Sequence, residues 1–212
     1  MLSVEQTDGE KKELWISGIE GHGEGMTGPK NLAWLNANGI TTVVSLHAPG
    51  WGRKTKTVRL ERETVVEGWE RIAGMAKWKV SECSLEQLET SGETTKWKGY
   101  WMQLLMEDGQ DGAEKMSRLW NGKGKYPPLP KDLLPWLLGR GNMLVHCQKG
   151  RSRSVTLVKR WLMCYGIHPD ELQIIINQSS QRYRRADATA APALQAWVLG
   201  AWEQMMDAHG WP

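Results

Sequence analysis

The sequence predicts an α/β domain in which a central mixed sheet of four or five strands carries helices on both faces. Two observations lead to this prediction. Near residue 142 a short apolar run ends in a loop and an amphipathic segment, which indicates a strand–loop–helix unit. Beyond residue 166, two further segments with apolar residues at helical spacing indicate helices that accompany this strand–loop–helix unit. Units of this kind place a loop at the carboxyl end of a strand, where α/β proteins bind ligands.

Turn residues organise the N-terminal region. The glycine-rich residues 18–28 predict a flexible loop. A helix is expected to begin near Pro29, because proline suits the first helical turn, and to stop at Gly39.

The C-terminal elements follow in the same way. Residues 142–145 predict a strand, and residues 154–165 predict a helix with a buried stripe of Val155, Val158, Leu162 and Tyr165. A break at residues 166–169 separates this helix from the next, and a last helix covers the region after residue 194. The chain has 13 tryptophans and no phenylalanine. We therefore expect tryptophans at core positions, among them Trp34, Trp161 and Trp197.

The segment between the strand and the helix holds the residues suited to chemistry. Cys147 directly follows the strand, and Arg153 stands six positions later, next to Ser154. A loop at this junction turns its N–H groups inward at the positive end of a helix, which suits a phosphate group. These donors and Arg153 favour the thiolate form of Cys147, which is the nucleophilic form. The planar guanidinium of Arg153 can hold two phosphoryl oxygens.

Two neighbours of these residues have supporting roles. Ser154 can donate a hydrogen bond to the sulfur of Cys147, and His146 is expected to fix the loop through hydrogen bonds. A cysteine after a strand is more often a small buried hydrophobe, and the spacing of Cys147 and Arg153 alone arises by chance in many chains. The combined pattern Val-His-Cys-x2-Gly-x2-Arg-Ser is far more specific, and it favours the catalytic interpretation.

This pattern resembles that of the cysteine-dependent dual-specificity protein phosphatases, within the protein tyrosine phosphatase superfamily. The likeness extends to residues 14–18, which resemble the family's opening strand, and to residues 31–46, which resemble its next helix and strand. Residues 152–207 resemble its C-terminal helices. It implies one catalytic domain over residues 1–212, in which Cys147 forms a phosphocysteine with help from Arg153 and Ser154. The residues implied to bind the substrate phosphate are Gln148, Lys149, Gly150, Arg151, Ser152 and Arg153.

The resemblance also implies a general acid, because the departing ester oxygen needs a proton. The family carries an aspartate in a loop after a strand of the form Tyr-x-x-Ile-x-x-x-Asp, and residues 100–108 are similar to it. Asp108 is therefore the candidate. Glu107 and Asp111 are close alternatives, because one sequence does not fix the register of a loop, and an acidic surface turn is another.

Residues 47–99 exceed the length that the family pattern needs here, so an insertion is expected. Within it, residues 67–80 are compatible with a helix, and residues 84–87 with the start of another short helix. The insertion is either a wall or lid beside the site, which would shape substrate choice, or a partly disordered surface excursion.

The resemblance implies a phosphorylated protein as substrate, with phosphotyrosine and phosphoserine or phosphothreonine accepted. The two additional loop cations, Lys149 and Arg151, keep a phosphoinositide or the 5′ triphosphate of RNA as alternatives. A phosphopeptide-binding pseudophosphatase is a further alternative. A rhodanese-like sulfurtransferase also uses a loop cysteine, but the Arg153-Ser154 ending argues against it.

Composition sets outer bounds on function. An apolar content of 40% over 212 residues suffices for one packed domain, and a net charge of +3 does not by itself indicate nucleic acid. Three cysteines suggest no disulfide framework and a working thiolate needs a reducing compartment, so we expect the cytoplasm or the nucleus. No run approaches the ~18 apolar residues of a membrane span. The five histidines show no ligand spacing, so neither a metal nor another cofactor is expected.

Overall fold

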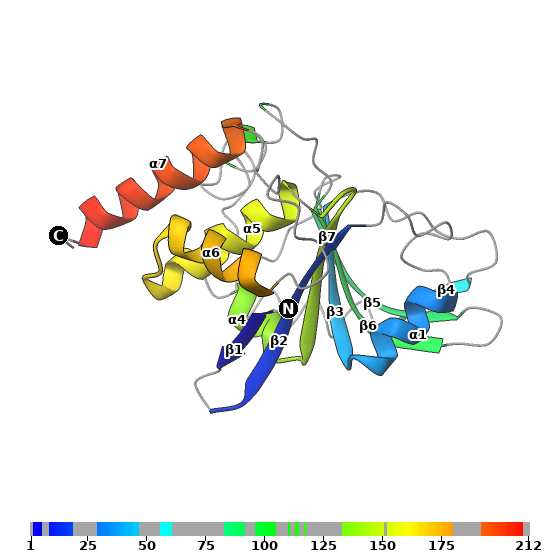
Figure 1. The fold of residues 1–212 in the computed structure, drawn as a ribbon. Coiled ribbons are helices and arrows are strands. Elements are labelled where there is room, and N and C mark those ends of the chain that lie inside the picture. Colours follow the sequence, from blue (N-terminus) through cyan, green and yellow to red (C-terminus); the bar gives the residue numbers. More distant parts are fainter. Residues whose placement is uncertain are drawn as a thin grey trace.

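A computed structural model gives the fold (Figure 1) and describes residues 2–5, 9–18, 29–46, 56–60, 83–91, 96–104, 110, 113–114, 117, 133–150, 152–179 and 192–209. The strands are β1 Leu2–Glu5, β2 Lys11–Gly18, β3 Ile40–Ser45, β4 Lys56–Leu60, β5 Cys83–Ser91, β6 Lys96–Leu104 and β7 Asn142–Cys147. The helices are α1 Pro29–Ala37, α4 Leu133–Leu138, α5 Arg153–Leu162, α6 Pro169–Ser179 and α7 Pro192–His209, with a 3-10 turn η1 at Met163–Tyr165.

The strands form one mixed sheet in the order β1-β2-β7-β3-β6-β5-β4. The four strands from β2 to β6 in this order are parallel to one another, whereas β1, β5 and β4 pair antiparallel with their neighbours. The predicted α/β class is confirmed. The five inner strands β2, β7, β3, β6 and β5 match the expected number of strands. The strands β1 and β4 add one strand at each edge of the sheet.

Helices lie on both sides of the sheet (Figure 1), and apolar side chains form a separate cluster on each side. Side chains alternate along each strand, so neighbouring residues of β3 and β7 enter different layers. Val43 and Leu144 pack with Leu32 and Leu35 of α1. Val44 and Val145 belong to the other layer, which lies beneath α4, α5, α6 and α7. Helices therefore cover both faces, as the sequence predicted.

Helix α5 is buried on all sides, because it lies between the sheet and the helices α6 and α7. The stripe residues Val155, Val158 and Leu162 are buried as predicted. Tyr165 was expected in the same stripe, but it is 48% exposed. The α-helix tightens into η1 at Met163, and the shorter turn of a 3-10 helix rotates Tyr165 away from the stripe.

The tryptophans divide between the core and the surface. Trp161 is buried, as expected, whereas Trp34 is 37% exposed and contacts Trp15 edge to face. Leu32 and Leu35 lie three positions apart on α1 and take the side that faces the sheet, so Trp34 points away from it. The side chain of Trp197 lies outside the described residues.

The expected insertion extends the sheet instead of forming the short helix predicted at residues 84–87. These residues belong to β5, which pairs antiparallel with β6 along its whole length, while β4 pairs with β5. Cross-strand pairing overrides the weak helical preference of this segment. The helix predicted at residues 67–80 lies outside the described residues.

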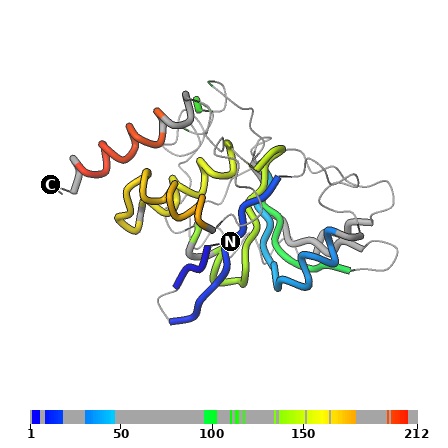
Figure 2. Tube along the Cα trace, viewed as in Figure 1, coloured from blue at the N-terminus to red at the C-terminus, as the bar shows by residue number. Residues whose placement is uncertain are grey.

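The C-terminal helix α7 packs on α5 and lies on the opposite side of the sheet from α1 (Figure 2). Gly166, with φ of +77°, ends η1 in the left-handed conformation before α6 begins. No described helix is long and apolar enough to cross a membrane.

Lys159→Met should raise the free energy of unfolding at pH 7 by about 1 kcal/mol, because Lys159 lies on the buried helix α5 with only 9% of its surface exposed. Burial lowers the pKa of Lys159 from its usual 10.5, and the Asp170 carboxylate partly offsets this effect. The unfolded chain therefore binds more protons at mildly alkaline pH, so wild-type stability rises there with pH, and the variant should lose this rise.

Urea unfolding at pH 7 and at about pH 9.5 measures both effects. Lys98→Met is the control, because Lys98 is an exposed lysine on β6. Equal behaviour of the two variants would contradict the prediction.

Candidate active site

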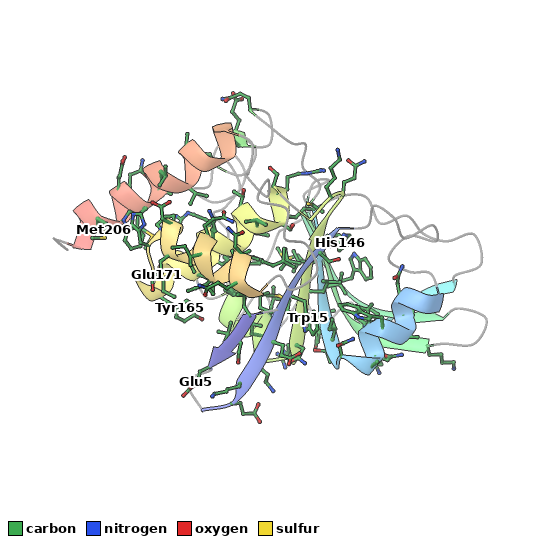
Figure 3. All side chains as sticks on the ribbon, in the orientation of Figure 1. Glu5, Trp15, His146, Tyr165, Glu171 and Met206 are labelled. Atoms are coloured by element: carbon green, nitrogen blue, oxygen red, sulfur yellow. The ribbon has the colours of Figure 1, made fainter. Side chains whose placement is uncertain are left out.

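The site lies at the edge of the sheet where the parallel strands end. In the parallel ladders, Ser17 of β2 and Ser45 of β3 are both paired with His146 of β7. Figure 3 shows His146 at the end of the sheet opposite Glu5. The loop from β7 to α5 begins directly after Cys147, so it leaves the sheet at this edge.

The sulfur of Cys147 faces the loop. The side chain is 1% exposed and packs among core residues. Its Sγ nevertheless accepts a hydrogen bond from the Gly150 N–H at 3.2 Å and lies 3.3 Å from Ser154 Oγ. A thiolate accepts from both groups, since a backbone amide and a hydroxyl can each donate. The arrangement therefore suits a sulfur anion.

The loop turns sharply at Gly150 and then enters α5. Gly150 has φ of +71°, a conformation that glycine adopts without strain. The Ser152 carbonyl accepts hydrogen bonds from the Thr156 N–H at 2.9 Å and from Thr156 Oγ1 at 2.8 Å, which closes the first turn of the helix. The positive end of the α5 dipole thus lies at the end of this loop.

Arg153 is the first residue of α5 and is 6% exposed. A cation at this end of a helix is opposed by the helix dipole, which favours negative charge there. An anion in the loop would meet both the guanidinium and the helix end. The start of α5 thus brings a guanidinium and the positive end of the helix dipole to the same place.

His146 connects the loop to β3. Its carbonyl accepts a hydrogen bond from the Leu46 N–H at 2.8 Å, and its ring Nε2 is hydrogen-bonded to Ser45 Oγ. The Trp101 ring lies edge-on to the imidazole, with the ring centroids 6.3 Å apart. The imidazole is fully buried, so it anchors the residue before Cys147.

The end of β2 touches the back of the loop. A Cβ atom added to Gly18 would lie 2.4 Å from the Lys149 carbonyl carbon and 2.7 Å from the Gly150 nitrogen. A Cβ atom added to Gly150 would lie 2.6 Å from the Gly18 nitrogen. Both positions therefore need glycine for this approach of two backbones.

No model of a known protein family matches the sequence, and no characterised protein matches it significantly. Solved structures do match. Human DUSP28 aligns with a TM-score of 0.50 at 13% identity, over 92% of this chain and 94% of its own. A structure describing the fingerprint of PTPN18 on HER2 tyrosine phosphorylation sites aligns with a TM-score of 0.51 at 13% identity, over 97% of this chain and 71% of its own. PTPN18 in complex with HER2 phosphopeptides gives a TM-score of 0.50 at 14% identity, over 97% and 70%.

The chain shares the fold of DUSP28 and PTPN18. This is the fold that the resemblance to the dual-specificity phosphatases implied. Identity at this level establishes a fold and leaves activity to be argued from the site.

Within this fold, the predicted residues Cys147, Gly150 and Ser154 lie within hydrogen-bonding distance of one another through the Cys147 sulfur. His146 directly precedes Cys147 in the chain and is hydrogen-bonded to Ser45. Gln148 and Lys149 are exposed on the same loop, while Ser152 and Arg153 are buried at the start of α5. Arg151 and the candidate acids Glu107, Asp108 and Asp111 lie outside the described residues. Strand β6, which precedes these acids, is parallel to β3 and so ends at the same edge of the sheet as β7.

Sequence analysis missed two residues of the site, Ser45 and Gly18. Each lies at the end of a predicted strand, and that position is the only signal the sequence offers. Among the described residues, no three His, Cys, Asp or Glu side chains are grouped in a way that could hold a metal ion.

Ser45→Ala should lower the free energy of unfolding by about 1–3 kcal/mol, because it removes a buried hydrogen bond of the His146 ring. Urea unfolding of the variant and of wild type measures the difference. Ser3→Ala is the control, since Ser3 is exposed on β1. A loss no larger than that of the control would mean that other contacts hold His146.

Proposed function

We propose that this protein hydrolyses phosphomonoesters through a phosphocysteine on Cys147, with phosphorylated tyrosine, serine and threonine side chains of proteins as substrates. One observation carries the proposal. The Cys147 sulfur lies 3.2 Å from a loop N–H and 3.3 Å from the Ser154 hydroxyl, at a strand–helix junction of a phosphatase fold. A cysteine that only fills apolar space in the core would not need polar groups around its sulfur.

The first step transfers the phosphoryl group to sulfur. The Cys147 thiolate attacks phosphorus in line with the ester oxygen, so an S–P bond forms while the P–O bond breaks. Asp108 gives its proton to the departing oxygen, which leaves as an alcohol or a phenol. The products are a phosphocysteine and an ionised Asp108.

The second step returns the enzyme to its starting state. The Asp108 carboxylate takes a proton from water, and the resulting oxygen attacks phosphorus as the S–P bond breaks. Ser154 Oγ, at 3.3 Å, donates a hydrogen bond to the departing sulfur and so stabilises the thiolate. Inorganic phosphate leaves, and Asp108 is protonated again.

Fixed dipoles stabilise the charge in both steps. The Gly150 N–H points into the loop, and α5 directs its positive end toward the same region. Arg153 adds a guanidinium that can follow two phosphoryl oxygens as charge spreads over them. Preorganised donors of this kind commonly make the largest contribution to catalysis.

A protein substrate is favoured by the family resemblance, and it agrees with the structure of PTPN18 in complex with HER2 phosphopeptides. A second candidate rests on Lys149, an exposed cation on the loop. Such a cation would favour a substrate with several phosphates, such as a phosphoinositide or the 5′ triphosphate of RNA. Initial rates on a phosphotyrosine peptide, a phosphoserine peptide and soluble inositol phosphates distinguish these classes.

Cys147→Ser should abolish hydrolysis of para-nitrophenyl phosphate, with a loss of at least about 10⁴-fold in kcat, because the nucleophile is removed. Wild-type activity should be blocked by vanadate and unaffected by EDTA. The control is Cys83→Ser, which changes a cysteine of β5. Activity that survives Cys147→Ser would refute the mechanism. Phosphopeptide binding by wild type without any turnover would instead indicate a pseudophosphatase.

Asp108→Asn should lower kcat by about 10²-fold or more for an alkyl phosphate and much less for para-nitrophenyl phosphate. An alkoxide needs the proton of the acid to leave, whereas para-nitrophenolate leaves without it. Steady-state kinetics on both substrates measures the contrast, with Asp111→Asn and Glu107→Gln as matched variants. An equal loss on both substrates would move the role of acid to one of these two residues.

A further inference from the structure

The last residue of β2 lies against the loop that carries the Cys147 hydrogen-bond donor. Gly18 is paired with Cys147 in the parallel ladder of β2 and β7. Beyond this pair, its Cα faces the Lys149–Gly150 peptide so closely that an added Cβ would lie within 2.4–2.7 Å of three backbone atoms. The contact is therefore between two backbones, with no flexible side chain that could give way.

The contact is equally close when a Cβ atom is added on the loop side, at Gly150. A Cβ atom added to Gly150 would lie 2.6 Å from the Ser17 carbonyl carbon and 2.6 Å from the Gly18 nitrogen. Ser17 and Gly18 are also paired with His146 and Cys147 in the parallel ladder of β2 and β7. The Lys149–Gly150 peptide thus lies against a strand end that the sheet holds in place.

The contact with Gly18 involves the atom that donates a hydrogen bond to the Cys147 sulfur. A Cβ atom on Gly18 would clash with the Gly150 nitrogen, and the Gly150 N–H donates this bond to Cys147 Sγ. Ordinary contacts begin at 3.4 Å, so a Cβ on Gly18 would push the peptide back by about 1 Å. The N–H would move with it, and shifts of this size in a site can cost about 10²-fold in rate.

We propose that Gly18 is a positioning residue of the active site, which holds the Lys149–Gly150 peptide so that the loop N–H groups face the phosphate before substrate arrives. The role deepens the proposed function and rests on it only for the kinetic readouts. Gly18 has no side chain that could reach the substrate or the Cys147 sulfur, and it acts through the loop backbone.

The fold offers a matched control at the other end of the sheet. A Cβ atom on Gly99 of β6 would lie 2.3 Å from the Thr41 carbonyl oxygen, which is as tight as the contact at Gly18. Thr41 lies near the start of β3, whereas the loop follows the end of β7. Gly99→Ala therefore introduces a similar clash away from Cys147. Gly200→Ala is a control for glycine replacement without a clash, because the added methyl group on α7 meets nothing within 4 Å.

The test compares Gly18→Ala with Gly99→Ala in steady-state hydrolysis of para-nitrophenyl phosphate and in competitive inhibition by inorganic phosphate. For Gly18→Ala we expect kcat/KM to fall by about 100-fold, with weaker phosphate inhibition and a higher KM. Gly99→Ala should lower stability and leave KM and phosphate inhibition unchanged, because its folded fraction keeps an intact loop. Unchanged KM and phosphate inhibition in folded Gly18→Ala would overturn the proposal.

If Gly18→Ala does not fold, a measurement on the wild-type protein tests whether the Lys149–Gly150 peptide is held in place. Amide hydrogen exchange without ligand should be at least about tenfold slower at Gly150 than in an unstructured peptide, because the contact with β2 keeps the hydrogen bond from the Gly150 N–H to Cys147 Sγ formed. Exchange at the unstructured rate would overturn the proposal. If wild type neither hydrolyses nor binds phosphate, the proposed function fails, and the exchange measurement still tests the role of Gly18.

Discussion

The parallel pairing of β7 with β2 on one side and β3 on the other is the constraint on which the site depends. It brings Gly18 beside Cys147 and Ser45 beside His146, at the edge where all three strands end. Each neighbour holds a different part of the loop. Ser45 fixes the imidazole of the residue before Cys147, and the backbone of Gly18 lies against the Lys149–Gly150 peptide after it. The cysteine is therefore anchored from both sides by strands that are distant in sequence.

The loop itself was predictable because its signals are local. The apolar run before Cys147, the glycine at position 150 and the stripe of α5 all lie within about twenty residues, and each follows from short-range geometry. The same reasoning placed α1 and its stop at Gly39, which has φ of +59°. These predictions needed no knowledge of how distant segments pair.

The features that sequence analysis missed depend on pairing between distant segments. Ser45 and His146 are 101 residues apart, and nothing local to either residue indicates their hydrogen bond. The strand at Cys83–Ser91 forms because β6 offers an edge, although its own pattern allows a helix. The predictions that Trp34 and Tyr165 are buried were wrong for a related reason. A hydrophobic side chain in a helix is buried only on the side that a neighbour covers, and the neighbour is set by the fold.

Helix α5 carries three buried cations, and they lie at both of its ends. Lys159 and Arg160 lie in the last turn, where the helix dipole favours positive charge, and Arg160 Nη1 donates to Met205 Sδ of α7 at 3.5 Å. Arg153 lies in the first turn, where the dipole opposes it. A guanidinium in the first turn adds to the positive end of the helix dipole, so the start of α5 concentrates positive charge next to the loop. A dianionic phosphate held by the loop would meet the guanidinium and the helix end together.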